Sequence, residues 1–276
     1  IGALTSLKYW LVSGEIHPVH PAALVIFLTI LLMSLLAKKS FCSWLCPVGT
    51  LSEGAFKIGR KLVGRNYRIW RWLDYGLRSI KYLLLLMFVK FILVDMSVEA
   101  LGGFLDAPYW AVSDVKMLHF FTSMSLTTMV VLAILTLLSL FYKMFWCRYL
   151  CPYGALLGFA SIVSPFKIRR DSTGCTGCQR CSAICPSCLE VHSSTAVSSP
   201  ECTGCLTCVA SCPERNVLAM QPGFWKQSLP VWVFPTVVLS IFMAGIGAGI
   251  ISGHWQSSLN YADYQKLMPL VPYLSH

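Results

Sequence analysis

The chain has 276 residues, of which 56% are hydrophobic and only 12% are charged. Soluble globular domains carry about 25% charged residues, so this composition excludes an ordinary soluble domain, and its hydrophobicity excludes a disordered chain. The formal net charge is +10. On a soluble protein such a charge would suggest nucleic-acid binding, but on a membrane protein it first indicates which loops face the cytoplasm.

Four apolar stretches predict transmembrane helices, because a helix needs roughly 20 apolar residues to cross a bilayer. In chain order they are residues 22–37, 82–98, 120–142 and 231–251. The fourth stretch contains Gly245 and Gly249 in a G-x-x-x-G frame, which lets two helices approach closely.

The basic residues predict how these spans are oriented. Segments 38–81 and 143–226 contain 18 of the 22 Lys and Arg residues, which places both segments in the cytoplasm. Residues 1–20, 99–118 and 253–276 then face the periplasm. The expected location is the bacterial inner membrane, with several passes, and the positive charge is explained without nucleic acid.

Eight cysteines form two copies of C-x2-C-x2-C-x3-C-P between residues 175 and 213. This spacing is typical of bacterial ferredoxins that hold two [4Fe–4S] clusters, in which the fourth cysteine of each run binds the other cluster. The doubled pattern argues against structural zinc, and a cytoplasmic location argues against disulfides. The predicted ligands are Cys175, Cys178, Cys181 and Cys212 for one cluster, and Cys202, Cys205, Cys208 and Cys185 for the other.

Two further residues of this region lie outside the cluster pattern. Cys188 has no place in either run, and His192 lies in the loop between the runs. We predict that Cys188 binds no cluster and that His192 is a surface residue.

A second cysteine motif occurs twice, 105 residues apart, after the first and third predicted spans. Cys42 and Cys46 recur as Cys147 and Cys151, and each pair is followed by Pro and G-x-L. Residues four apart share a helix face, so each pair can present two sulfurs in one direction, and the proline ends or restarts the helix. Three interpretations remain: a further iron–sulfur cluster or metal, redox-active thiols, or small core residues.

The duplicated C-x3-C-P motif, followed by the double ferredoxin run, resembles the NapH/NosR family of polytopic iron–sulfur membrane proteins. The resemblance covers residues 17–215 and implies electron transfer between a quinone pool or cytoplasmic donors and periplasmic redox partners. NosR-type members carry an extracytoplasmic flavin domain that this chain has no room for. NapH-type members generally end near the ferredoxin domain, whereas this chain adds residues 231–276.

Four histidines are predicted at the outer membrane face: His17, His20, His119 and His254. Neutral imidazoles bind haem or metals and accept protons from a quinol, although histidine is also common as an interfacial residue. The H-P-x-H-P pattern of His17 and His20 matches the segment before the first span in the family. We therefore predict a haem, metal or quinol site at these two residues.

These patterns predict an α-helical polytopic membrane protein of about four transmembrane helices with an inserted cytoplasmic α+β domain like a bacterial two-cluster ferredoxin. The expected domains are residues 1–165 (membrane), 166–222 (ferredoxin-like) and 223–276 (C-terminal helix and outer tail). The chain carries no substrate-binding motif, which favours a subunit of a larger oxidoreductase complex over a free-standing enzyme.

The expected function is electron transfer between the cytoplasmic-side clusters and a quinone or a periplasmic cytochrome, flavin or iron–sulfur protein. The alternatives are an assembly factor that reduces a metal such as copper, a membrane thiol–disulfide redox protein, and a structural anchor whose clusters only stabilise the fold.

Overall fold

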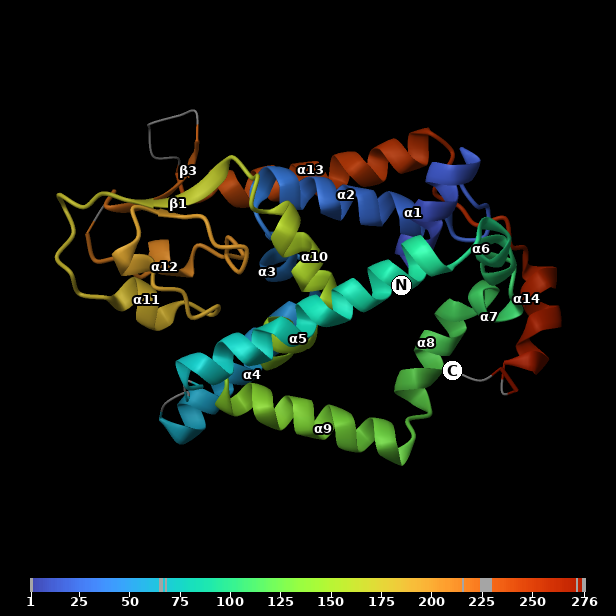
Figure 1. Ribbon diagram of the computed structural model, residues 1–276, viewed down its shortest axis with the longest axis horizontal. Coiled ribbons are helices and arrows are strands. Elements are labelled where there is room, and N and C mark those ends of the chain that lie inside the picture. The colour runs from blue at the N-terminus through green and yellow to red at the C-terminus, as the bar shows by residue number, and fades with distance from the viewer. Residues whose placement is uncertain are drawn as a thin grey trace. The chain divides into compact units, whose positions relative to one another are not determined.

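The computed structural model describes residues 2–64, 67, 69–214, 216–223, 230–271 and 273–274 (Figure 1). The chain packs as two compact units. Unit 1 consists of Ile1–Thr29, Leu86–Leu132 and Met243–His276, and unit 2 consists of Ile30–Leu85 and Ala133–Phe242. The predicted division into three domains along the sequence stays a prediction.

Most of the described chain is helical, as expected, and its apolar helices differ in length. Helix α13 (Val233–Ile251) is long and apolar enough to cross a membrane, whereas α2 (Pro21–Ala37) is apolar but shorter. The predicted third span is broken into α8 (Ser113–Thr122) and α9 (Leu126–Phe141), which bend by 77° at the break. By length and composition, the described residues contain one spanning helix, or two if the bent pair forms one span.

The predicted second span begins inside a helix whose first half is charged. Helix α5 (Arg71–Val89) carries Asp74, Arg78 and Lys81 before its apolar half, and the chain then continues as the π-helix η1 (Lys90–Asp95). These charges lower the mean hydropathy of α5. The number of spans therefore stays a prediction.

The G-x-x-x-G frame of α13 packs against α2 of the same chain. A Cβ added at Gly245 would lie 2.2 Å from the Thr29 hydroxyl oxygen, and one at Gly249 would lie 2.6 Å from a Val25 methyl carbon. Only glycine allows the two helices this approach. These two glycines therefore form a contact within the chain.

The remainder of unit 1 consists of short helices. Helix α1 (Gly2–Ser13) packs on α6 (Val98–Leu105) and on η1. The Lys8 ammonium donates to the carbonyls of Ile92 (3.0 Å) and Met96 (2.5 Å), at the end of the π-helix. The other helices are α7 (Pro108–Ala111), α14 (Tyr261–Leu267) and the 3-10 turn η4 (Met268–Leu270).

Unit 2 contains both cysteine-rich regions. The repeated motif lies on α3 (Phe41–Trp44), α4 (Pro47–Val63), the π-helix η2 (Trp146–Leu150) and α10 (Pro152–Ala160). The ferredoxin-like insert is an antiparallel sheet in the order β2-β1-β3 with three short helical segments. Its elements are β1 (Phe166–Arg170), α11 (Arg180–Ile184), η3 (Val191–Ser193), β2 (Ala196–Val197), α12 (Thr207–Ala210) and β3 (Leu218–Pro222).

One hydrophobic core joins the insert to the apolar helices. Ile168 of β1 and Met220 of β3 pack in the same cluster as Ala37 of α2 and Phe234 of α13. Cys202 and Cys208 belong to this core as well. The second ferredoxin run is therefore anchored directly on α2 and α13.

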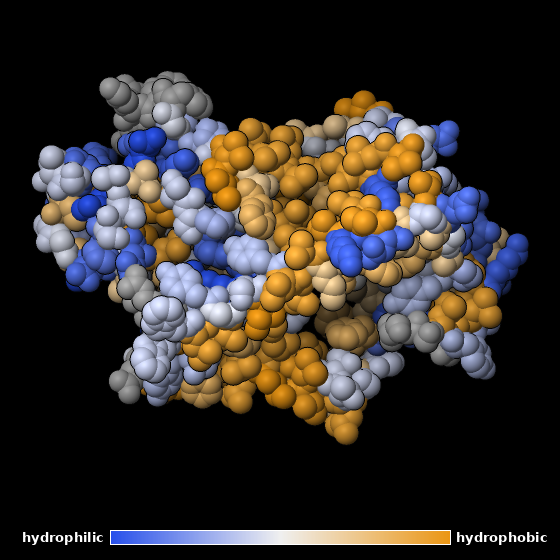
Figure 2. Space-filling view, viewed as in Figure 1, coloured by the Kyte–Doolittle hydropathy of each residue, from blue (hydrophilic) through white to orange (hydrophobic). Residues whose placement is uncertain are grey.

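Large hydrophobic side chains are exposed along the helices that the sequence predicts to span a membrane. Figure 2 shows hydrophobic surface over α2, α9 and α13 on the face in view. On α9 the exposed side chains are Leu126, Met129, Val130, Val131, Ile134 and Leu137. A continuous apolar surface of this kind needs a covering phase, which supports a membrane location.

The two glycines 245 and 247 provide a matched test of the α2–α13 contact. Gly245→Ala should destabilise the protein by about 1–3 kcal/mol, because its methyl group collides with Thr29. Gly247 has no atom within 4 Å of an added Cβ, so Gly247→Ala should stabilise the helix by up to ~1 kcal/mol. Thermal unfolding in detergent measures both, and equal effects of the two variants would contradict the contact.

Candidate metal centres

Four cysteines of the insert line one cavity near its surface. They are Cys175, Cys178, Cys181 and Cys212, the set expected to bind one cluster. Gly177 and Gln179 adopt positive φ angles of 72° and 56°, which turn the loop tightly around the sulfurs. The backbone N–H of Gly177 donates to Cys175, and this bond, together with the Arg170 side chain, lowers the pKa of Cys175.

The other four cysteines of the insert line a second cavity: Cys185, Cys202, Cys205 and Cys208. The loop geometry recurs 27 residues later, with positive φ at Gly204 (63°) and Leu206 (60°). The Gly204 N–H donates to Cys202 in the same way. In both loops the fourth cysteine comes from the other run, as the crossed ligand pattern predicts.

The two cavities differ in their exposure to solvent. In the first, Cys178 is exposed and the other three cysteines are half-buried. In the second, Cys185, Cys202 and Cys208 are buried. We call the first the outer centre and the second the inner centre.

The duplicated membrane motif forms a third cavity. Its four cysteines, Cys42, Cys46, Cys147 and Cys151, line one space of about 100 Å³, compared with about 20 Å³ at each of the inner and outer centres. The structure thus brings together two sequence segments that are 105 residues apart. We call this space the membrane-motif cavity.

The two copies of the motif share one backbone geometry. In neither copy do the two cysteines lie on one continuous helix, although their spacing allows it. Cys46 and Cys151 are the N-cap residues of α4 and α10, and the following proline is the first residue of each helix. Their N–H groups donate to the carbonyls of Phe41 (2.9 Å) and Trp146 (3.0 Å), five residues earlier. The proline thus restarts the helix, so the two sulfurs of a pair come from consecutive segments.

The membrane-motif cavity strongly favours the neutral thiols when no cation is present. Burial raises the pKa of Cys42 to about 12 and that of Cys147 to about 11, and it also raises the pKa of Cys151. Thiolates bind metals whereas thiols do not. A bound cationic iron core would offset this burial penalty.

A buried carboxylate beside this cavity holds two lysines. Glu201 accepts hydrogen bonds from Lys81 at 2.6 Å on both oxygens, from Tyr82 at 2.8 Å and from Lys39 at 3.4 Å. Burial by itself would raise the pKa of Glu201, but the two lysines outweigh it and hold the pKa at about 2. Lys39 and Glu201 both line the membrane-motif cavity.

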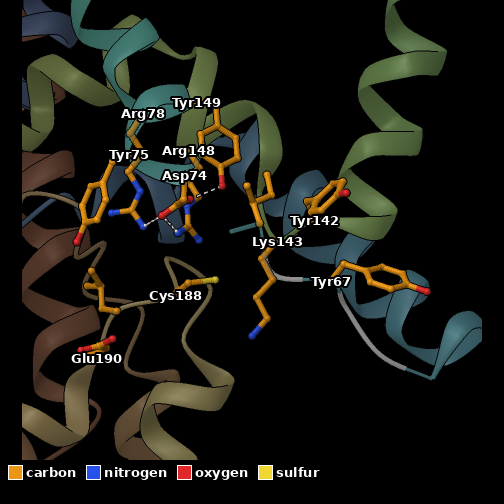
Figure 3. Close-up of a pocket in the computed structure, with 12 residues that line it drawn as sticks. Tyr67, Asp74, Tyr75, Arg78, Tyr142, Lys143, Arg148, Tyr149, Cys188 and Glu190 are labelled. Carbon is orange, nitrogen blue, oxygen red and sulfur yellow. Dashed lines mark hydrogen bonds and ion pairs between the residues drawn. The ribbon is translucent and has the colours of Figure 1, made fainter. Parts of the chain in front are cut away.

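A second buried ion pair lies beside the same cavity. Figure 3 shows the guanidinium groups of Arg78 and Arg148 and the Tyr149 hydroxyl converging on Asp74. The Asp74 carboxylate accepts from Arg78 at 2.6 Å, from Arg148 at 2.8 Å and from Tyr149 at 2.5 Å. Arg148 follows Cys147 directly. It lines both the polar cavity drawn in Figure 3 and the membrane-motif cavity.

The charges around the membrane-motif cavity fit a cluster. The two networks place two lysines against one glutamate and two arginines against one aspartate, an excess of positive charge that an anionic tetrathiolate cluster would balance. Among the described residues, no three His, Cys, Asp or Glu side chains are spaced to hold a single metal ion. A [4Fe–4S] cluster needs wider spacing, because each thiolate binds a different iron atom.

Comparisons with known proteins agree with this arrangement. The family model of a 4Fe-4S binding domain matches residues 19–66 and 124–171, the two copies of the membrane motif. The model of a 4Fe-4S dicluster domain matches residues 167–217, the ferredoxin-like insert. No solved structure matches the chain.

Several curated proteins are similar in sequence. YccM of Escherichia coli (strain K12), named as an electron transport protein, is 44% identical over the whole chain, which covers 78% of YccM. The chain belongs to this family of ferredoxin-type electron transport proteins. The ferredoxin-type protein NapH of Haemophilus influenzae is 27% identical over 59% of the chain and 53% of NapH. The regulatory protein NosR of Pseudomonas aeruginosa is 30% identical over 52% of the chain and 20% of NosR.

Family membership establishes electron transport as the general role of the protein and [4Fe–4S] clusters as its cofactors. The resemblance inferred from the cysteine motifs is therefore confirmed. The assignment of individual cysteines to clusters goes beyond these comparisons and is part of the proposal below.

His17 and His20, two of the four predicted outer-face histidines, make local contacts within unit 1. The His17 Nε2 atom lies 3.2 Å from the Asp106 carboxylate, and His20 Nε2 lies 2.9 Å from the Trp110 carbonyl. Because a carbonyl only accepts, His20 donates from Nε2. Both rings thus fasten the segment before α2 to residues 106–110.

The two insert residues outside the cluster pattern have different surroundings. Cys188 lines the polar cavity of Figure 3, outside all three cysteine cavities. For His192 the structure gives a more detailed position than the sequence did. It is half-buried, lines the outer centre, and its Nδ1 lies 2.9 Å from the Ser182 hydroxyl.

Sequence reasoning missed the buried charges. Lys38, Lys39, Lys81, Glu201, Asp74 and Arg148 surround the cavities, and none was singled out as a site residue. Their positions in the sequence could have pointed to them: Glu201 directly precedes Cys202, Arg148 follows Cys147, and Lys38 and Lys39 follow an apolar helix.

Glu201→Gln tests the buried network. The amide keeps the shape of the side chain but leaves Lys39 and Lys81 without a counter-charge. Breaking a buried pair costs about 3–5 kcal/mol, so we expect a large fall in the denaturant midpoint of the cluster-loaded protein. Glu214, which is exposed, is the matched control. A midpoint for Glu201→Gln equal to that of Glu214→Gln would contradict the network.

Proposed function

We propose that this protein is a membrane-embedded electron-transfer subunit of the bacterial inner membrane, with its ferredoxin-like insert on the cytoplasmic side. It passes electrons between the insert and a quinone or a redox protein on the periplasmic side. Cys175, Cys178, Cys181 and Cys212 hold one [4Fe–4S] cluster, and Cys185, Cys202, Cys205 and Cys208 hold the other. Cys42, Cys46, Cys147 and Cys151 hold a further cluster.

The observation that carries this proposal is the continuity of the cysteine cavities. Pro186, Ser187 and Thr203 line both the inner centre and the membrane-motif cavity, so a single layer of residues separates the two. Cys181 of the outer centre and Cys185 of the inner centre are joined by one short helix, α11. The three cavities therefore follow one another from the solvent-exposed part of the insert toward the apolar helices.

The division into two units supports the membrane topology. The two basic segments 38–81 and 143–226 lie within unit 2, and the predicted periplasmic segments 1–20, 99–118 and 253–276 lie within unit 1. Helices α2, α5, α9 and α13 have residues in both units. All four of these helices carry exposed large hydrophobic side chains, among them Leu32 on α2, Leu86 on α5, Leu126 on α9 and Ile251 on α13.

A [4Fe–4S] cluster takes up and releases single electrons. The residues of this chain bind it through thiolates, exclude water from the inner centre and balance its negative charge with buried lysines and arginines. At the periplasmic end, His17 and His20 stay the proposed contacts for a haem, metal or quinol. The partner there is a cytochrome, flavin or iron–sulfur protein, or a quinone.

The cysteine environment favours this function over thiol–disulfide exchange. That reaction needs a thiolate as the nucleophile, whereas burial raises the pKa of Cys42 and Cys147 well above the usual range. Cys42 and Cys147 are therefore weak nucleophiles in the absence of a bound metal.

Iron and acid-labile sulfide analysis tests the third cluster. Two clusters account for about eight iron atoms per chain, and we expect distinctly more in protein purified without oxygen. Cys147→Ser should lower the content to about eight. Cys188→Ser, whose sulfur lies outside the three cavities, should leave it unchanged. Equal iron in wild type and Cys147→Ser would exclude a cluster at the membrane motif.

Proteoliposomes test electron transfer across the membrane. Dithionite added to vesicles with the insert facing outward should reduce ferricyanide trapped inside, because electrons pass from the insert through the protein. Cys147→Ser should slow this reduction at least tenfold while the spectra of the insert clusters persist, and Cys188→Ser should match wild type. Loss of ferricyanide at the rate of protein-free vesicles would contradict the proposed function.

A further inference from the structure

Lys38 occupies an unusual position at the end of α2. It is fully buried, and its backbone has a φ angle of 60°, a left-handed conformation that non-glycine residues seldom adopt. The Ser164 hydroxyl holds this turn by accepting from the Lys38 N–H at 2.9 Å and donating to the Leu36 carbonyl at 2.8 Å. The conformation directs the Lys38 side chain into the core instead of toward solvent.

The Lys38 ammonium has no hydrogen-bond partner among the described residues. A buried charge without a partner is costly in a protein interior. Lys167 is a second positive charge close enough to oppose the ammonium. The Lys38 ammonium thus lacks a hydrogen-bond acceptor and is opposed by a second positive charge. Both observations call for a negative group near Lys38.

The inner centre lies beside this lysine. The segment that follows Lys38 runs along the loop of Cys202: Lys39 bonds to Glu201, the Ser43 hydroxyl donates to the Thr203 carbonyl at 2.8 Å, and the Trp44 indole donates to the Gly204 carbonyl at 3.2 Å. Ala37 and Cys202 belong to one hydrophobic core. Burial lowers the pKa of Lys38, and a thiolate at Cys202 would act in the opposite direction.

We infer that the Lys38 ammonium is the counter-charge of the cluster held by Cys185, Cys202, Cys205 and Cys208, and that it raises the reduction potential of this cluster. This inference rests on the ligand set proposed above. Lys38 carries no electrons itself and acts only through the effect of its charge on the cluster.

The physical reason is the cost of adding charge in a buried place. Reduction makes a tetrathiolate cluster more negative, and water stabilises that charge poorly when the sulfurs are buried. A buried ammonium favours the reduced cluster, so it offsets the effect of burial. The inner centre then stays reducible by electrons that arrive through the more exposed outer centre.

Consecutive lysines thus serve two neighbouring centres. Lys38 follows the core residue Ala37, which shares a cluster with Cys202, and its ammonium has no partner among the described residues, whereas Lys39 lines the membrane-motif cavity and is paired with Glu201. Because Lys39 shares its charge with Glu201, its influence is weaker and its removal would also disturb the Glu201 network. Lys38 is therefore the cleaner position for a test.

The test is a potentiometric titration of purified protein followed by EPR spectroscopy. Lys38→Met removes the charge at similar volume, and we expect the reduction step of the inner cluster to move to lower potential while iron per chain stays at the wild-type value. Lys38→Arg keeps the charge and should hold that step closer to wild type. Arg170→Met, beside Cys175 at the outer centre, should move only the reduction step of the outer-centre cluster.

The outcomes separate this inference from the proposed function. If Lys38→Met binds full iron and the reduction steps of both insert clusters stay at wild-type potential, the role of Lys38 is disproved and the proposed function is unaffected. If Cys202→Ser removes neither reduction step, the proposed ligand set is wrong, and the inference fails with it.

Discussion

The Glu201 carboxylate is the contact on which the arrangement of unit 2 depends. It binds Lys39 after α2 and Lys81 on α5, while the next residue, Cys202, belongs to the inner centre. Three segments separated by up to 162 residues therefore meet at one carboxylate. A buried ion pair gives little net stability, but it strongly penalises every arrangement that separates its members. The network thus holds the ferredoxin-like insert in one register against the helices that carry the membrane motif.

The cysteine cavities show two different ways of gathering sulfurs. In the insert, tight loops with residues in left-handed conformations place three sulfurs around one space, and the partner run supplies the fourth. In the membrane motif, a helical turn ends and a proline restarts the next helix, so that Cys46 and Cys151 become N-caps. In the second copy the Cys151 sulfur accepts from the Gly154 N–H at 3.3 Å, at the N-terminal end of a helix, where negative charge is stabilised.

Buried positive charges lie near the inner centre and the membrane-motif cavity. Few charges exist in the chain, yet Lys38, Lys39, Lys81 and Arg148 are buried around the cysteines. Burying cations is favourable only where anions accompany them. With the ligand sets proposed above, thiolate-bound clusters supply that negative charge, and the clusters gain in return an environment in which the reduced state is less costly. Stability of the fold and redox behaviour therefore depend on the same residues.

The sequence by itself determined the cofactor class, the eight cysteines of the insert, the duplicated motif and the family. These features follow from spacing along the chain, because a short loop places its ligands locally whatever surrounds it. The tertiary structure decided what spacing could not: that four distant cysteines share one cavity, that α13 packs its glycines on α2, and that the third apolar stretch bends at residues 123–125. The fold also buries Lys38 and pairs Glu201 with Lys39 and Lys81, because the surroundings of a buried charge depend on which distant segments meet.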